Sequence, residues 1–150
     1  GEPVGDLEIR HSLLRGVSIR GARVPAMIDE FPAFAVAAAC AEGVSEVHDA
    51  EELRVKESDR IAALCGELRK VGVEAIEYRD GFRIIGRKEV PGGETDPHGD
   101  HRLAMAMAIL GLAAAGPMVV RNAAITEESF PDFAGALQRL GANVRLEREE

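Results

Sequence analysis

Three positively charged side chains crowd residues 54–60, RVKESDR, where a helix is expected to begin. Cations at a helix N-terminus oppose the helix dipole, so Lys56 and Arg60 do not stabilise this helix start by themselves. They suit the position better if an anion lies between them and the backbone N–H groups. An arginine guanidinium also has the planar shape that pairs with carboxylate or phosphate. The alternative is a solvated helix start held by salt bridges, with Ser58 as its cap.

A second polar segment, residues 98–102 (HGDHR), precedes an Ala- and Met-rich helical pattern. Arg102 at the start of this helix again indicates an anion, whereas the alternative is a polar loop in which Asp100 only caps the helix. A metal site is disfavoured because the acid and the two histidines lie close together in the chain and no glutamate follows at helical spacing.

Carboxylates accompany both cationic segments. Asp29 comes just before a helical pattern with Pro32 in its first turn, which is typical of an N-cap. Beside a cationic anion site, an acid such as Asp29 could instead accept the proton of a hydroxyl group. Glu57 lies between Lys56 and Arg60 within the first cationic segment. The sequence therefore predicts anion-binding cations at helix starts, with acids next to them.

Apolar periodicity and glycine stops predict alternating helices and strands around these residues. Helices are expected at 30–42, from Ser58 to the stop at Gly72, at 101–115 and at 130–140, and strands at 44–48, 73–78, 82–85, 118–121 and 144–146. Ile61, Leu64, Leu68 and Val71 give the second helix an apolar stripe at helical spacing. The strands at 73–78 and 82–85 are expected to form a hairpin around residues 79–81, and a further hairpin is expected between residues 7 and 19. The order helix–strand–helix–strand recurs after about 70 residues, and in this register Asp29 and Arg102 occupy equivalent helix starts.

Composition excludes several classes of protein. The chain has 150 residues, 46% of them hydrophobic and 29% charged, as in a globular domain. Its net charge of −8, without a broad basic face, argues against binding to nucleic acid. No 18-residue apolar run or signal peptide is evident. Cys40 and Cys65 are interpreted as buried side chains in a reducing, cytoplasmic compartment. The chain begins without Met and is interpreted as a piece of a longer protein.

Four segments together resemble the 5-enolpyruvylshikimate-3-phosphate synthase family: residues 29–32 (DEFP), 54–60, 98–102 and 129–131 (SFP). They occur in that family's order and spacing, and the resemblance covers the whole chain but only the C-terminal part of the enzyme. It implies an α/β (α+β) fold of repeated β-α-β-α-β-β units, with helices packed against mixed sheets. This chain would be part of one domain, with residues 1–22 as the tail hairpin of a preceding unit and two units at 29–86 and 100–147.

The resemblance implies an enzyme that transfers the enolpyruvyl (carboxyvinyl) group of phosphoenolpyruvate to the 5-hydroxyl of shikimate 3-phosphate, releasing phosphate. This step belongs to aromatic amino-acid biosynthesis and is the target of glyphosate. Asp29 matches the acid that contacts the shikimate hydroxyls and is proposed as the base. Lys56 and Glu57 match the pair beside the reacting carbons, with Glu57 as a proposed proton donor. Arg60 and Arg102 match arginines that bind phosphoenolpyruvate.

The same resemblance implies no cofactor and no metal, and a missing N-terminal domain that completes the site, so the isolated chain is expected to be inactive. No membrane partner is expected. Two positions depart from the pattern of some members: Glu128 replaces a Lys and Glu52 replaces an Asn, and neither receives a role. Two alternatives stay open, the related UDP-N-acetylglucosamine enolpyruvyl transferase and a non-catalytic module that kept the fold.

Overall fold

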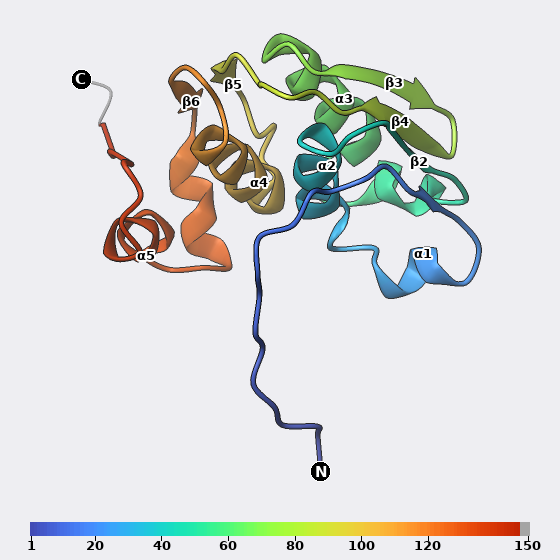
Figure 1. Ribbon diagram of the computed structural model, residues 1–150, viewed down its shortest axis with the longest axis horizontal. Coiled ribbons are helices and arrows are strands. Elements are labelled where there is room, and N and C mark those ends of the chain that lie inside the picture. Colours follow the sequence, from blue (N-terminus) through green and yellow to red (C-terminus); the bar gives the residue numbers. More distant parts are fainter. Residues whose placement is uncertain (148–150) are drawn as a thin grey trace.

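Two small β-sheets and the helices beside them make up the folded part of the computed structural model, which describes residues 1–147 (Figure 1). The strands are β1 (Ser18–Ile19), β2 (Val44–Val47), β3 (Glu74–Tyr78), β4 (Gly81–Ile85), β5 (Gly93–Thr95) and β6 (Met118–Val120). The α-helices are α1 (Arg23–Ala26), α2 (Phe31–Ala39), α3 (Arg60–Lys70), α4 (His101–Leu112) and α5 (Phe133–Arg139), and the 3-10 helices are η1 (Glu51–Val55) and η2 (Ala123–Glu128).

The larger sheet is mixed, with strand order β1-β2-β4-β3. β1 runs parallel to β2, whereas β4 is antiparallel to both β2 and β3. The predicted hairpin around residues 79–81 is confirmed, because Tyr78 pairs with Gly81 across a two-residue turn. A Cβ atom at Gly81 would lie 1.9 Å from the carbonyl oxygen of Val47, so glycine is needed where β4 passes this close to β2.

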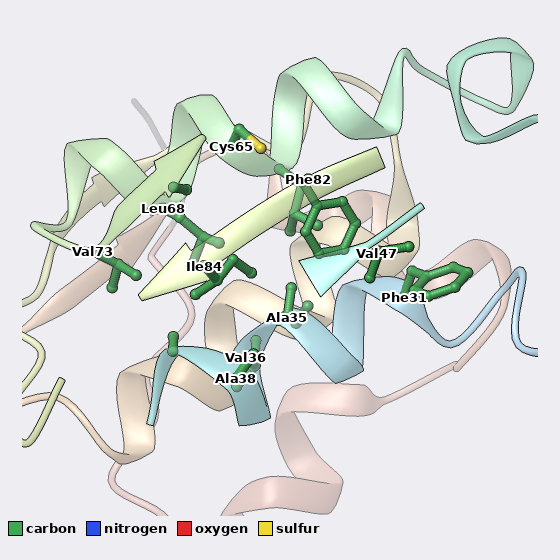
Figure 2. Close-up of a cluster of buried hydrophobic side chains, with 14 of the residues drawn as sticks. Phe31, Ala35, Val36, Ala38, Val47, Cys65, Leu68, Val73, Phe82 and Ile84 are labelled. Carbon is green, nitrogen blue, oxygen red and sulfur yellow. The ribbon is translucent and has the colours of Figure 1, made fainter. Parts of the chain in front are cut away.

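One face of this sheet is covered by helices. Phe82 and Ile84 of β4 are fully buried and lie between the apolar side chains of α2 and α3 (Figure 2). The apolar stripe predicted for α3 is confirmed, since all of its members are buried: Ile61, Leu64, Leu68 and Val71. Burying such a stripe against the sheet fixes how α3 is rotated about its own axis. Its first residue, Arg60, is therefore also directed inward.

The predicted recurrence is present in part: helix, strand and helix recur in both halves, but the last predicted strand of the second half is missing. Apart from α1 and the β3–β4 hairpin, the order β1-α2-β2-η1-α3 recurs as β5-α4-β6-η2-α5, and in each half the two strands are parallel neighbours. β5 was not predicted because its three residues lie in a stretch rich in glycine and proline. Both halves place a helix start after a strand, as expected for helical crossovers. The division into units at 29–86 and 100–147 stays a prediction.

The predicted N-terminal hairpin is wrong. Residues 7–10 form no strand, and the side chains of Leu7 and Ile9 are 92% and 89% exposed. β1 pairs instead with β2, while the segment before it extends away from the body of the chain (Figure 1). A two-stranded hairpin is marginally stable without an apolar surface to cover, and residues 7–10 contact none.

Several predicted element ends also differ. Glu30, not Asp29, is the N-cap of α2, which ends at Ala39 although the glycine stop lies at Gly43. Asp59 caps α3 by accepting a hydrogen bond from the N–H of Ala62, so Ser58 is free for another contact. The last helix begins at Phe133, later than predicted.

Two further expectations differ from the structure. Residues 144–146 form no strand. Cys40 is exposed, whereas Cys65 is buried as predicted. Among residues 1–147, no helix is long and apolar enough to cross a membrane.

Candidate active site

Three helix starts meet at one point of the fold and bring together residues that are far apart in the sequence. Asp29 lies just before α2, Arg60 is the first residue of α3, and Asp100 is the N-cap of α4. α2 packs against both α3 and α4, so the three starts converge. The helix starts at which an anion site was predicted therefore lie close together, and anion binding there stays a prediction.

Arg60 is at the centre of this location and is bonded to three carboxylates. Its side chain is only 2% exposed. Its Nε lies 2.6 Å from Oδ2 of Asp100, while its two terminal nitrogens lie 2.5 Å from Oε2 of Glu57 and 3.3 Å from Oδ1 of Asp29. Burial alone would lower the pKa of Arg60, but these acids, Asp100 above all, raise it. A buried guanidinium of this kind is stable only because it is paired.

Asp100 is fully buried and holds Arg60 from the opposite helix. Its carboxylate accepts hydrogen bonds from the N–H groups of Arg102 (3.0 Å) and Leu103 (3.3 Å) and from the hydroxyl of Ser58 (3.3 Å). Burial raises the pKa of Asp100, but Arg60 and the two backbone N–H groups lower it more, so the net shift is downward. The capping role expected for Asp100 is confirmed, but its pairing with Arg60 was not predicted.

Arg102 joins the same cluster through Asp29. Its Nη2 lies 3.2 Å from Oδ2 of Asp29, and its Nη1 donates a hydrogen bond of 3.4 Å to the backbone oxygen of Asp29. Its Nε is buried and has no hydrogen-bond partner among the described residues. Arg102 and Asp29 also form one end of a groove of about 250 Å³ between α2 and α4, which Pro32 and Met105 help to line.

The structure separates the three cations of residues 54–60. Arg54 donates hydrogen bonds to the carbonyl oxygens of Tyr78 and Arg79, and so fixes the β3–β4 turn. Lys56 is paired with Glu52 and makes no contact with Arg60 or Asp29 in the described part of the chain. Only Arg60 reaches the cluster. Of the predicted site residues, the structure therefore brings together Asp29, Glu57, Arg60 and Arg102, and leaves Lys56 apart.

The geometry suits an anion with acid–base groups beside it. Asp29 and Glu57 are 44% and 41% exposed, whereas their partner Arg60 is buried. An incoming carboxylate could compete with these two acids for the guanidinium groups, while Asp100 keeps Arg60 in place from behind. The displaced acids would then be close to the bound anion and available for proton transfer. Among residues 1–147, no group of three or more His, Cys, Asp or Glu side chains could hold a metal ion.

Replacing Asp100 with Ala should destabilise the fold. The substitution leaves the Arg60 guanidinium buried without its principal partner, and breaking a buried ion pair in this way costs about 3–5 kcal/mol. Urea unfolding of the chain, followed by circular dichroism, measures the change. Arg139→Ala is the control, because Arg139 and Asp132 form an ion pair of 2.7 Å on the surface, where such pairs contribute little. Equal midpoints for the two variants would contradict the structural role of Asp100.

Comparison with known proteins identifies the family of the chain. The sequence model for EPSP synthase (3-phosphoshikimate 1-carboxyvinyltransferase) matches residues 1–146. The chain belongs to the EPSP synthase family. The 3-phosphoshikimate 1-carboxyvinyltransferases of Synechococcus sp. and Carboxydothermus hydrogenoformans are each 51% identical to it over 93% of its length. The chain spans only about a third of those relatives, 32% and 33%.

Solved structures agree with this EPSP synthase fold. An EPSP synthase from Acinetobacter baumannii matches 85% of the chain with a TM-score of 0.80 at 39% identity, and the match covers 30% of that protein. The enolpyruvyl transferase NikO from Streptomyces tendae matches 89% of the chain with a TM-score of 0.71. Its identity is 23%, so this second likeness bears on the fold alone. The predicted fold class, helices on mixed sheets of the enolpyruvyl transferase type, is confirmed.

Proposed function

We propose that this chain forms one wall of an enolpyruvyl transferase site, where the carboxyvinyl group of phosphoenolpyruvate passes to the 5-hydroxyl of shikimate 3-phosphate and phosphate is released. The observation that carries the proposal is the convergence of two arginines on one carboxylate. Arg60 and Arg102, from the starts of α3 and α4, both contact the side chain of Asp29. Two guanidinium groups held this way offer paired donors to the carboxylate of phosphoenolpyruvate.

The acids of the cluster take the proton-transfer roles in this proposal. Asp29 is the base toward the 5-hydroxyl, and Glu57 donates a proton to the methylene carbon. Both are half-exposed and both contact Arg60, so they would border an anion bound there. Lys56 lies beside the reacting carbons only if its side chain leaves Glu52, to which it is paired in this structure.

The rest of the site comes from outside this chain. Because the chain spans about a third of its relatives, the groups that hold the shikimate ring and its phosphate are assigned to an N-terminal domain of the same enzyme. The proposed partners are the two substrates and that domain, with no nucleic acid, membrane or cofactor. A cytoplasmic location accompanies the proposal, as does the family's role as the target of glyphosate. The free thiols of Cys40 and Cys65 are consistent with a reducing compartment.

The direct test is to assay a full-length enzyme that carries this chain for phosphate release from phosphoenolpyruvate. Release should require shikimate 3-phosphate. Substituting UDP-N-acetylglucosamine as the acceptor tests the related transferase, and should give no release. Phosphate release with the nucleotide sugar and not with shikimate 3-phosphate would reject the proposal, as would the absence of release with either acceptor.

Replacing Arg102 with Ala in the full-length enzyme should weaken phosphoenolpyruvate binding. A lost hydrogen bond to a charged group costs roughly 1.5–3 kcal/mol, or about 10- to 150-fold in affinity. We expect the KM for phosphoenolpyruvate to rise by this factor, while Arg139→Ala, on the exposed side of α5, leaves it unchanged. Unchanged KM and kcat for Arg102→Ala would remove this residue from the site.

A further inference from the structure

A second buried carboxylate, Glu67, lies on α3 outside the cluster described above. Its side chain is only 1% exposed. Its Oε1 lies 2.8 Å from Nζ of Lys70 and 2.7 Å from Nε2 of His98, and its Oε2 accepts a hydrogen bond of 2.9 Å from the N–H of Asp96. Burial raises the pKa of Glu67, but these partners lower it more, so the net shift favours the ionised carboxylate. A charge buried in this way must be paired. Two of the partners of Glu67 are distant in the sequence: Asp96 is 29 residues away and His98 is 31 residues away.

Those two distant partners belong to the segment 96–99, which leads directly into α4. Within this segment His98 and Gly99 are consecutive residues with positive φ, 52° and 74°. A histidine in the left-handed region is uncommon, and such a conformation persists only where the surroundings hold it. Glu67 supplies two of the contacts that hold it, because it binds both the backbone at Asp96 and the ring of His98.

Glu67 and Arg60 fasten this segment to the same face of α3. They are seven residues apart, about two helical turns, so their side chains point in the same direction. Arg60 binds Asp100, the residue directly after the segment, and Glu67 binds Asp96 and His98 within it. The first turn of α4, which carries Arg102, starts immediately after these contacts.

We propose that Glu67 is a positioning residue for Arg102: by holding residues 96–98 on α3, it sets where the first turn of α4 presents the Arg102 guanidinium to the anion. This inference rests on the proposed function for the identity of the anion. Glu67 itself touches no substrate, because it is buried behind the segment. Its effect should therefore appear in the binding of phosphoenolpyruvate and not in that of shikimate 3-phosphate.

Two variants of the full-length enzyme test the proposal. Glu67→Gln keeps the shape of the side chain and removes its charge. His98→Asn removes the ring that reaches Glu67, while asparagine tolerates positive φ, and the half-exposed position of His98 should leave the fold intact. Glu74→Gln, at an exposed position of β3, is the matched control. Both test variants should raise the KM for phosphoenolpyruvate by roughly 10-fold and leave the KM for shikimate 3-phosphate unchanged.

A double-mutant cycle that combines Glu67→Gln with Arg102→Ala distinguishes an effect of Glu67 on the position of Arg102 from a general loss of stability. If Glu67 acts through Arg102, Glu67→Gln should add no further increase in KM once Arg102 is alanine. Two increases that multiply would overturn the proposal. So would a fall in kcat without any change in KM, because that is the result of a smaller folded fraction.

Amide hydrogen exchange tests whether Glu67 holds this segment in place, and the test does not depend on which substrates the enzyme uses. The amides of residue 96 and of residues 98–103 should lose protection in both test variants and keep it in Glu74→Gln. Absence of phosphate release by the wild-type enzyme would reject the proposed function, whereas unchanged exchange of these amides in the two variants would reject the role of Glu67.

Discussion

Purified by itself, the 150-residue chain should not catalyse phosphate release from phosphoenolpyruvate and shikimate 3-phosphate. It carries Asp29, Glu57, Arg60 and Arg102 in one cluster, but it spans only about a third of its relatives. Holding both reactants in a reactive arrangement can contribute ~7–11 kcal/mol of the rate enhancement, and one wall of a site cannot supply it. Coupled phosphate detection at high protein concentration measures the residual turnover.

The control for this expected inactivity is evidence that the chain is folded. Although inactive, the chain should give the circular dichroism spectrum of a folded α/β protein and unfold cooperatively in urea. The reason is that α2, α3 and the larger sheet share a continuous apolar core (Figure 2). Turnover close to that of a full-length family member would show that residues of this chain complete the site. The roles assigned to the missing domain would then be wrong.

Replacing Glu57 with Gln in the full-length enzyme should lower kcat by about 10²- to 10⁴-fold, the usual contribution of general acid–base catalysis. Glutamine keeps the size and polarity of the side chain and can still accept a hydrogen bond from Arg60, which lies 2.5 Å from Oε2 of Glu57. Arg60 also keeps Asp100 and Asp29 as partners. The KM for phosphoenolpyruvate should therefore change much less than kcat.

Glu51→Gln is the matched control, because Glu51 is exposed and lies in the same segment before α3. Its kcat should equal that of the wild type. A kcat for Glu57→Gln within a few-fold of the wild type would mean that Glu57 only balances the charge of Arg60. The proton donor would then have to be another group, with Asp29 the next to test by the same substitution to the amide.

Local features of the sequence determined much of the fold. The apolar stripe of α3, its end near Gly72 and the hairpin that follows were predictable because they depend on neighbouring residues and on turn chemistry. The prediction of an N-terminal hairpin failed because it depended on distant residues. Alternating apolar and polar side chains at residues 7–10 do not form a strand without an apolar surface to pack on. β5 depends on a parallel partner in β6, more than twenty residues later, and carried no local signal.

The sequence also determined which residue types could bind an anion and move protons, but it did not distinguish the three cations of residues 54–60. One signal was available: Arg60 precedes Leu64 by four residues and so shares the buried stripe of α3. By the same spacing, Glu67 lies on the inward face of that helix.

Only the tertiary structure decided how these charges are paired. Arg60 meets Asp100 forty residues away, and Arg102 meets Asp29 seventy-three residues away. Such pairs form where the packing of α2, α3 and α4 brings the helix starts together. These pairs cannot be predicted from the spacing of residues along the chain. Burying a guanidinium or a carboxylate costs free energy, and that cost is offset only by a partner of opposite charge on another helix.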